Sequence, residues 1–220
     1  MRDKKYWEGF YNNFRSPYPP SPFSVYCLNK YLKRGMCLVE LGCGNGRDAV
    51  FFAEHGLKVI AIDQCCNELD FLREQQNFSN LRWICSDFSR LDKELGTGQV
   101  VYSRFTLHAI DAESERRTLD WSAAFLQPGG YFCIEARGIQ NEIYGRGRPV
   151  NGERNAFIYE GHYRRFLVFE ELCASLKKRG FQFEEACEEN GIAPWNGQDE
   201  MFIRVIARKC FPESNVVSGE

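Results

Sequence analysis

The chain has 220 residues, of which 44% are hydrophobic and 15% aromatic, enough for one globular domain with a substantial core. Its formal net charge of −2 argues against general nucleic-acid binding. The N-terminus has no apolar core of signal-peptide length, and no run approaches the roughly 20 apolar residues of a membrane span. We therefore expect a cytoplasmic protein with no membrane partner, either a monomer or a homodimer.

Ten cysteines are present, and none belongs to a C-x-x-C pair. The three histidines lie far from any cysteine pair, so no metal site is expected. Cys37, Cys85 and Cys133 lie in apolar runs typical of strands, and most of the cysteines are therefore predicted to be buried free thiols. A redox role for the adjacent Cys65 and Cys66 has no supporting spacing.

Residues 1–34 precede the first predicted core strand. Aromatic side chains recur at helical spacing from Tyr6 to Phe14, with Trp7 and Tyr11 among them, which predicts a short aromatic helix. The helix either packs on the domain or covers a ligand as a lid, and the sequence leaves both open.

Four prolines between Ser16 and Phe23 predict a stiff, extended stretch. Ser21 and Pro22 then suit the cap and first turn of a helix that runs to about Leu32 and ends at Gly35. The stiff stretch forms either a wall of a ligand site or a connector.

The stretch from Cys37 to Asp63 shows a buried strand, a glycine-rich turn, a helix and a second buried strand ending in an acid. This order predicts a βαβ unit with a ligand crevice at the strand ends. Asp63 follows the first glycine of the turn by 21 positions, where an acid can reach ribose hydroxyls. A tight turn without a ligand is the alternative. Glycine loses much conformational entropy on folding, however, so three glycines and a terminal acid favour a turn that binds a ligand.

The glycine turn has the spacing Glu40-x-Gly42-x-Gly44-x-Gly46, and Arg47 stands where the dinucleotide fingerprint requires glycine. This pattern resembles motif I of the class I S-adenosylmethionine-dependent methyltransferases. The resemblance implies S-adenosylmethionine as cofactor, with its ribose diol on Asp63. The candidate cofactor-binding residues are Trp7, Tyr11, Glu40, Gly42, Cys43, Gly44, Gly46, Asp63, Gln64, Asp87, Phe88 and Ser103.

The next elements are a predicted helix over Glu68–Gln76 and a third strand over Leu81–Cys85. Asp87 follows that strand, where the resemblance implies a contact to the adenine amino group, with the Phe88 backbone facing the ring nitrogen. Capping of a helix near Leu91 is the alternative role for Asp87.

A fourth strand is predicted over Gln99–Ser103. The resemblance implies that residues at its end, Arg104 and His108 first, face the transferring methyl group. No Asn/Asp-Pro-Pro-Tyr-type tetrad follows this strand, which argues against an adenine-N6 or glutamine N-methyltransferase.

An amphipathic helix over Ala112–Phe125 precedes Leu126–Gly130, a turn that resembles the L-x-P-G-G motif leading into the fifth strand of the family. Tyr131–Glu135 is that strand. The resemblance implies an α/β, Rossmann-like fold with a seven-stranded, mostly parallel sheet of order 3-2-1-4-5-7-6, helices on both faces and an N-terminal helical lid.

The C-terminal part completes one domain spanning residues 1–210. We predict a helix over Phe169–Arg179, and strands Phe181–Cys187 and Met201–Lys209 as an antiparallel hairpin at the sheet edge. Residues 211–220 are expected to form a disordered tail.

Residues 136–166 form an arginine-rich insertion, in which Gly145–Pro149 is predicted to be a mobile loop. In this superfamily such an insertion commonly covers the acceptor, and arginine suits phosphate or carboxylate. Solvated surface charge is the alternative. The candidate acceptor-binding residues are Arg104, Arg137, Tyr144, Arg146, Arg148, Tyr163, Arg164 and Arg165, and the candidate catalytic residues are Arg104, His108 and His162.

The function predicted from these features is S-adenosylmethionine-dependent methylation, at oxygen, of a small anionic metabolite such as a phosphate, phosphoramidate or carboxylate. The N-terminal aromatic segment and Gly44-Asn45-Gly46-Arg47-Asp48 are similar to the thiopurine and tellurite-resistance branch. A thiol, selenium or tellurium methyltransferase is therefore one alternative. A non-catalytic S-adenosylmethionine-binding protein is the other, although Glu40 and Asp63 are both present.

Overall fold

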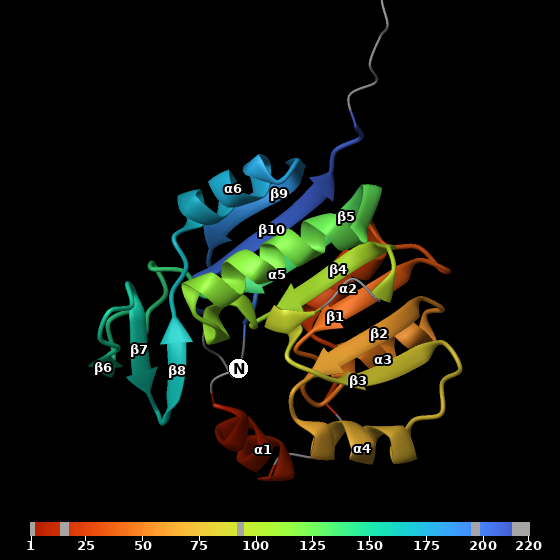
Figure 1. Ribbon diagram of the computed structural model, residues 1–220, viewed down its shortest axis with the longest axis horizontal. Helices are drawn as coiled ribbons and strands as arrows, with labels where there is room; N and C mark the ends of the chain where they lie inside the picture. The colour runs from red at the N-terminus through yellow and green to blue at the C-terminus, as the bar shows by residue number, and fades with distance from the viewer. Residues whose placement is uncertain (1–2, 14–17, 92–94, 195–198, 213–220) are drawn as a thin grey trace, which may run out of the picture.

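Short apolar runs form the central sheet of the protein (Figure 1). The computed structural model describes residues 3–13, 18–91, 95–194 and 199–212. The strands are β1 (Cys37–Leu41), β2 (Lys58–Asp63), β3 (Leu81–Cys85), β4 (Gly98–Arg104), β5 (Leu126–Ala136), β9 (Phe181–Glu189) and β10 (Phe202–Lys209). Their order is β3-β2-β1-β4-β5-β10-β9, and β10 runs antiparallel to both neighbours. The predicted order is confirmed, because β9 and β10 are the sixth and seventh strands of this sheet.

Helices cover both faces of the sheet. Helices α2 (Pro22–Lys30), α3 (Arg47–Glu54) and α4 (Cys66–Gln75) pack on one face, and α5 (Ala112–Phe125) and α6 (Phe169–Lys178) on the other (Figure 1). Side chains alternate between the two faces along a strand. Leu38 therefore packs in the core beneath α2, α3 and α4, and Val39 in the core beneath α5 and α6. Both positions are apolar because the strands are buried on both faces.

Capping side chains mark the starts of α2 and α5. Ser21 caps α2 by accepting a hydrogen bond from the Ser24 backbone N–H at 3.1 Å, as predicted. Helix α5 has the predicted bounds, with Asp111 as its cap. Strand β5, however, already begins at Leu126, so the predicted turn at Leu126–Gly130 is wrong in part. Its glycines instead accompany a register irregularity against β4 between Gly98 and Val100.

The arginine-rich insertion folds as a separate three-stranded antiparallel sheet of β6 (Arg148–Pro149), β7 (Ala156–Tyr159) and β8 (His162–Arg165). The predicted loop at Gly145–Pro149 is therefore wrong at its end, where Arg148 and Pro149 pair with Ile158 and Phe157. The small sheet lies to one side of the main sheet, on the side where helix α1 (Lys4–Asn13) is found (Figure 1).

The small sheet and α1 touch through the start of β8. The Tyr163 backbone N–H donates to Asp3, and the rings of Tyr6 and Trp7 lie 4.4 and 5.4 Å from the ring of His162. The insertion thus supports the N-terminal helix.

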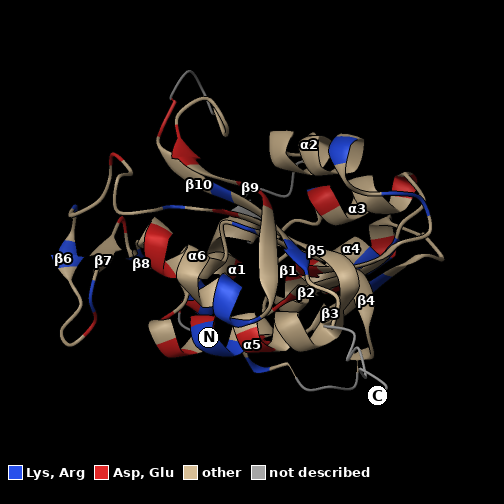
Figure 2. Ribbon diagram, turned by 90° about the horizontal axis from the view of Figure 1, so that it is seen from above, with Lys and Arg blue, Asp and Glu red and all other residues tan. Residues whose placement is uncertain are grey.

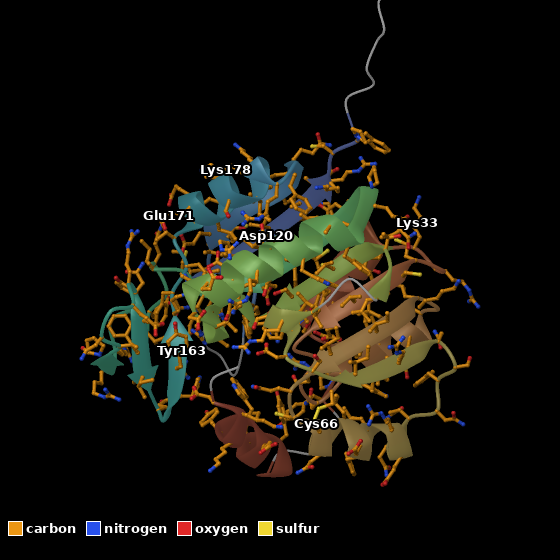
Figure 3. The ribbon with its side chains drawn as sticks, in the orientation of Figure 1. Lys33, Cys66, Asp120, Tyr163, Glu171 and Lys178 are labelled. Carbon is orange, nitrogen blue, oxygen red and sulfur yellow. A yellow bond between two sulfur atoms is a disulfide. The ribbon has the colours of Figure 1, made fainter. Side chains whose placement is uncertain are left out.

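A disulfide joins Cys66, at the start of α4, to Cys85, at the end of β3 (Figure 3). The other eight cysteines are free, but only Cys27, Cys43, Cys65 and Cys133 are buried, so the prediction that most are buried free thiols is wrong in part. Cys85, expected to be a free thiol, is paired with Cys66. The described residues contain no group of His, Cys, Asp or Glu that could hold a metal ion. Among the described helices, none is long and apolar enough to cross a membrane.

Two short 3-10 helices, η1 (Phe88–Arg90) and η3 (Leu107–Ala109), follow β3 and β4. Figure 2 shows acidic and basic residues interspersed over the ribbon. Most of the predicted tail, residues 213–220, lies outside the described residues.

Candidate functional site

A cavity of about 380 Å³ opens at the carboxyl ends of β1, β2 and β4, where open α/β sheets bind ligands. Its lining comes from the glycine turn, the strand ends, α1 and the segment before β10. The lining residues are Trp7, Phe10, Tyr11, Tyr18, Glu40, Gly42, Cys43, Gly44, Asn45, Arg47, Asp48, Asp63, Gln64, Phe88, Arg104, Phe105, Thr106, Ala109, Arg137, Ala193, Glu200 and Phe202.

The glycine turn brings its backbone close to other groups in the cavity. A Cβ at Gly44, where φ is +54°, would lie 2.3 Å from the Tyr11 hydroxyl, and one at Gly42 would lie 2.5 Å from the Thr106 methyl. Only glycine fits these positions without displacing the cavity wall. The glycines therefore let Tyr11 and Thr106 pack directly on the backbone of the turn, beside the cavity.

Asp63 ends β2 with both carboxylate oxygens held by backbone donors. One oxygen accepts from the Gly44 N–H and the other from the Cys65 N–H, each at 2.9 Å. The side chain is 7% exposed and lines the cavity. Each oxygen has more than one lone-pair site, so the fixed carboxylate can also accept from a ligand hydroxyl.

Glu40 is a buried carboxyl group with an oxygen that accepts no hydrogen bond from the described residues. It is 5% exposed, and its buried Oε2 has no hydrogen-bond partner among the described residues. Burial and then the negative charge of Asp48 raise the pKa of Glu40 well above its ordinary value, while Arg47 and Arg104 oppose that rise. An unpaired acid on a cavity wall is suited to a cationic ligand group.

Asp48, in the first turn of α3, accepts hydrogen bonds from two other segments, the start of α2 and β4. Its Oδ1 accepts from the Ser21 backbone N–H and the Ser24 hydroxyl, and its Oδ2 from the hydroxyls of Ser21 and Tyr102, at 2.7 to 2.9 Å. This carboxylate thereby fixes the start of α2 against α3 and β4. Tyr18, just before this junction, lines the cavity.

Helix α1 contributes an aromatic wall made by Trp7, Phe10 and Tyr11. The Tyr11 hydroxyl is buried against the glycine turn. Burial and the nearby Asp63 carboxylate raise its pKa well above the ordinary value. A neutral tyrosine hydroxyl can donate a hydrogen bond as well as accept one.

The far end of the cavity combines rings with guanidinium groups. Phe105 and Phe202 stack with centroids 5.0 Å apart, and the guanidinium groups of Arg104 and Arg137 lie 4.0 and 4.8 Å from the Phe105 and Phe202 ring centroids. The Arg104 Nε donates to buried Glu135 at 3.0 Å. Burial raises the pKa of Glu135, and the neighbouring Arg104 and Arg204 oppose that rise.

Comparison with known proteins agrees with this geometry. A family model described as a methyltransferase domain matches residues 38–130, which hold the glycine turn, Asp63 and the end of β4. Residues 38–130, less than half of the chain, thus match a methyltransferase domain. S-adenosylmethionine is the cofactor of this family.

Two curated relatives are methyltransferases. The cypemycin N-terminal methyltransferase of a Streptomyces species is 30% identical over 97 residues, covering 44% of this chain and 40% of the relative. The tRNA N(3)-methylcytidine methyltransferase Mettl2 of Drosophila melanogaster is 27% identical over 163 residues, covering 67% and 49%. The matches thus span less than half the length of these relatives.

A solved structure has the same fold. The Burkholderia thailandensis 1,6-didemethyltoxoflavin-N1-methyltransferase superposes with a TM-score of 0.67 at 21% identity, covering 86% of this chain and 77% of its own. At this identity the likeness establishes the fold alone.

The methyltransferase domain brings most of the predicted cofactor residues to one cavity. Trp7, Tyr11, Glu40, Gly42, Cys43, Gly44, Asp63, Gln64 and Phe88 line it, while Gly46, Asp87 and Ser103 do not. Gly46 caps α3 in a left-handed conformation, where a Cβ would lie 2.5 Å from the Trp83 ring. Asp87 caps η1 by accepting from the Ser89 N–H at 2.9 Å, the alternative that the sequence left open.

Ser103 is the third of these exceptions. Its hydroxyl is fully buried and lies 2.5 Å from the Thr106 hydroxyl. Thr106, rather than Ser103, lines the cavity.

The two candidate histidine bases are not placed in the cavity lining. Buried His108 accepts the Arg137 backbone N–H at its Nδ1, at 3.1 Å, and burial with the nearby charge of Arg137 holds its pKa well below the ordinary value. His162 packs beneath α1, and burial lowers its pKa to about 4. Neither side chain lines the cavity, and their predicted role as bases stays a prediction.

The predicted acceptor residues divide in the same way. Arg104 and Arg137 line the cavity, whereas Tyr144, Arg146, Arg148, Tyr163, Arg164 and Arg165 do not. Four of these six make contacts outside it: Tyr144 donates to Asn155, Tyr163 to Glu153, Arg164 to the Tyr159 carbonyl and Arg165 to the Ile110 carbonyl. These interactions stabilise the small sheet and its junction with the domain.

Sequence reasoning missed Phe10, Tyr18, Asn45, Arg47, Asp48, Phe105, Thr106, Ala109, Ala193, Glu200 and Phe202 as lining residues. The sequence could have indicated Arg47 and Asp48 as lining residues, because they directly follow the glycine turn. It gave no such indication for Glu200 and Phe202, because they reach the cavity only through the pairing of β10 with β5.

Proposed function

We propose that the protein is an S-adenosylmethionine-dependent methyltransferase that acts on a small anionic metabolite, at oxygen. The observation that carries this proposal is the juxtaposition of unpaired Glu40 with the glycine turn and the backbone-held Asp63 carboxylate. Two carboxyl groups beside the turn fit a cofactor with an ammonium group and a ribose diol.

Distinct residues would hold the distinct parts of the cofactor. Glu40 would neutralise a positive charge, Asp63 would accept from the ribose hydroxyls, and Phe88 would pack against the base. Bound S-adenosylmethionine supplies an electrophilic methyl group. The residues of this chain position the acceptor and exclude water, for which the aromatic wall of α1 is suited.

Arg104 and Arg137 would bind the acceptor anion. Their guanidinium groups are already oriented, since Arg104 donates to Glu135 and Arg137 pairs with Glu200 and donates to Asn141 at 2.8 Å. An acceptor that arrives ionised needs no base for displacement at the methyl group. This fits the engagement of His108 and His162 elsewhere.

Calorimetry with S-adenosylhomocysteine tests the cofactor half of the proposal. We expect saturable binding to the full chain that Asp63→Ala weakens at least about tenfold, the effect of one strong hydrogen bond. Arg137→Ala should leave that affinity within about threefold and instead raise the acceptor KM. Equal effects of both variants on cofactor affinity would contradict these assignments.

Turnover assays with S-adenosylmethionine test the acceptor half. The acceptors offered should include small phosphates and carboxylates, small thiols, and tRNA, because one relative is a tRNA methyltransferase. Methylation confined to thiols would overturn the O-methyl assignment, and methylation confined to tRNA would overturn the small-molecule assignment.

A further inference from the structure

The part of the cavity lining where we place the acceptor includes apolar side chains. Phe105 and Phe202 are nearly parallel, with 26° between their planes, and Ala109 and Ala193 also line the cavity. Small alanine side chains beside two stacked rings are suited to a flat group. A compact inorganic anion would leave this apolar surface uncovered.

Phe105 is held in an unusual backbone conformation. Its φ is +59°, a region that bulky side chains rarely adopt and that costs about 1 kcal/mol or more. The Phe105 N–H donates to the Glu135 carbonyl at 2.8 Å, and the Arg104 guanidinium covers the ring. Such strain persists at functional sites where the surroundings impose it, and here it directs an aromatic ring to the cavity.

The positive charges at this end are not all neutralised. Arg104 and Arg204 share the single carboxylate of Glu135, which leaves one net positive charge in that buried group. Arg137 is balanced by Glu200. Arg47 lines the cavity and has no hydrogen-bond or ion-pair partner among the described residues.

Arg47 and Arg104 line the same cavity, although they come from the start of α3 and the end of β4. The terminal nitrogens of Arg104 have no hydrogen-bond partner among the described residues, because only its Nε is engaged by Glu135. Unpaired guanidinium nitrogens from two elements are thus available to one anionic group.

We propose that this site takes a small planar aromatic acid, with its ring against the apolar lining around Phe105 and its anionic group on Arg104 and Arg47. This inference rests on the proposed function and narrows it from any small anion to an aromatic one. Methylation of an ionised oxygen of such an acid forms one C–O bond and breaks the C–S bond of the sulfonium. The electron pair passes to sulfur, and no proton is lost.

Calorimetry on the full chain saturated with S-adenosylhomocysteine tests this inference, with benzoate as the probe. We expect saturable binding of benzoate, and binding about tenfold weaker for neutral benzamide, which lacks the charge. Cyclohexanecarboxylate keeps the charge but lacks the flat ring, and inorganic phosphate lacks the ring altogether. Both should also bind more weakly than benzoate.

Substitutions in the cavity lining test which residues contact benzoate. Arg47→Met should weaken benzoate about tenfold and leave S-adenosylhomocysteine affinity within about threefold. Arg82→Met, at an exposed position of β3 outside the cavity lining, is the matched control and should change neither. Phe105→Leu should reduce the preference for benzoate over cyclohexanecarboxylate, and Phe202→Leu provides the same test should Phe105→Leu fail to fold.

The outcomes separate this inference from the proposed function. If S-adenosylhomocysteine binds but benzoate shows no saturable binding at millimolar concentration, this inference is overturned and the proposed function stands. Benzamide or phosphate binding as tightly as benzoate would also overturn it, as would unchanged benzoate affinity in Arg47→Met. If S-adenosylhomocysteine itself does not bind, both fail.

Discussion

Replacing Glu40 by glutamine should stabilise the free protein and weaken cofactor binding. The Glu40 carboxyl is 5% exposed, and its Oε2 has no partner among the described residues. A buried, unsatisfied polar group costs about 1–3 kcal/mol. Glutamine keeps the shape and removes the charge but retains a polar amide. We therefore expect the free energy of unfolding to rise by about 1 kcal/mol at pH 8.

The pH dependence follows from the raised pKa of Glu40. The folded protein holds the Glu40 proton more tightly than the unfolded chain, so this residue lowers stability as pH rises above the ordinary glutamate pKa. A bound ammonium group favours the ionised carboxylate. Affinity for S-adenosylhomocysteine should therefore rise as pH rises through the Glu40 pKa, and Glu40→Gln should remove this rise.

Urea unfolding and calorimetry measure the two effects on the same variant. Loss of one charge-assisted interaction, about 1.5–3 kcal/mol, corresponds to a loss of affinity of roughly ten- to a hundredfold. Glu54→Gln, at an exposed position of α3, is the matched control and should change stability by less than about 0.5 kcal/mol. The reasoning would be refuted if Glu40→Gln destabilised the free protein while leaving the affinity and its pH dependence unchanged.

Two further predictions concern the residues around this acid. Gly44→Ala should reduce S-adenosylhomocysteine affinity at least about tenfold, because its Cβ would meet the Tyr11 hydroxyl at 2.3 Å and the backbone is left-handed. Calorimetry of Gly44→Ala with Tyr11→Ala separates the causes: full recovery would show that the clash alone matters. Asp48→Asn should lower the free energy of unfolding by about 2–4 kcal/mol, because four donors then share one acceptor oxygen. Tyr102→Phe removes one donor and should cost about 1 kcal/mol in urea unfolding; an equal loss for both variants would contradict the network.

The position of the cavity was predictable because its signals are local. The glycine spacing and the terminal acid at Asp63 lie within one βαβ unit, and the chain connectivity alone brings them to one edge of the sheet. The sheet order followed from the family resemblance carried by this unit and by the motif at Leu126–Gly130. That motif predicted the following strand correctly even though its own residues belong to β5.

The arginines that line the cavity were predicted less well, because composition does not fix the direction of a side chain. The arginine density of residues 136–166 suggested an anion site there. Pairing of β6, β7 and β8 instead turns Arg164 toward a backbone carbonyl and Arg165 toward Ile110 and Glu115. A guanidinium group within reach of a carbonyl or carboxylate satisfies its donors locally, and the sequence does not show which partners will be near.

The sequence by itself determined the sheet, the glycine turn and the acid that follows it, since these depend on apolar periodicity and on residues close along the chain. Only the tertiary structure decided which arginines remain unpaired at the cavity and which aromatic ring lies beside them. Arg47 and Arg104 come from α3 and β4. Phe202 comes from β10, and the antiparallel pairing of β10 with β5 brings it to the cavity. Their juxtaposition depends on contacts between distant segments, which no local pattern records.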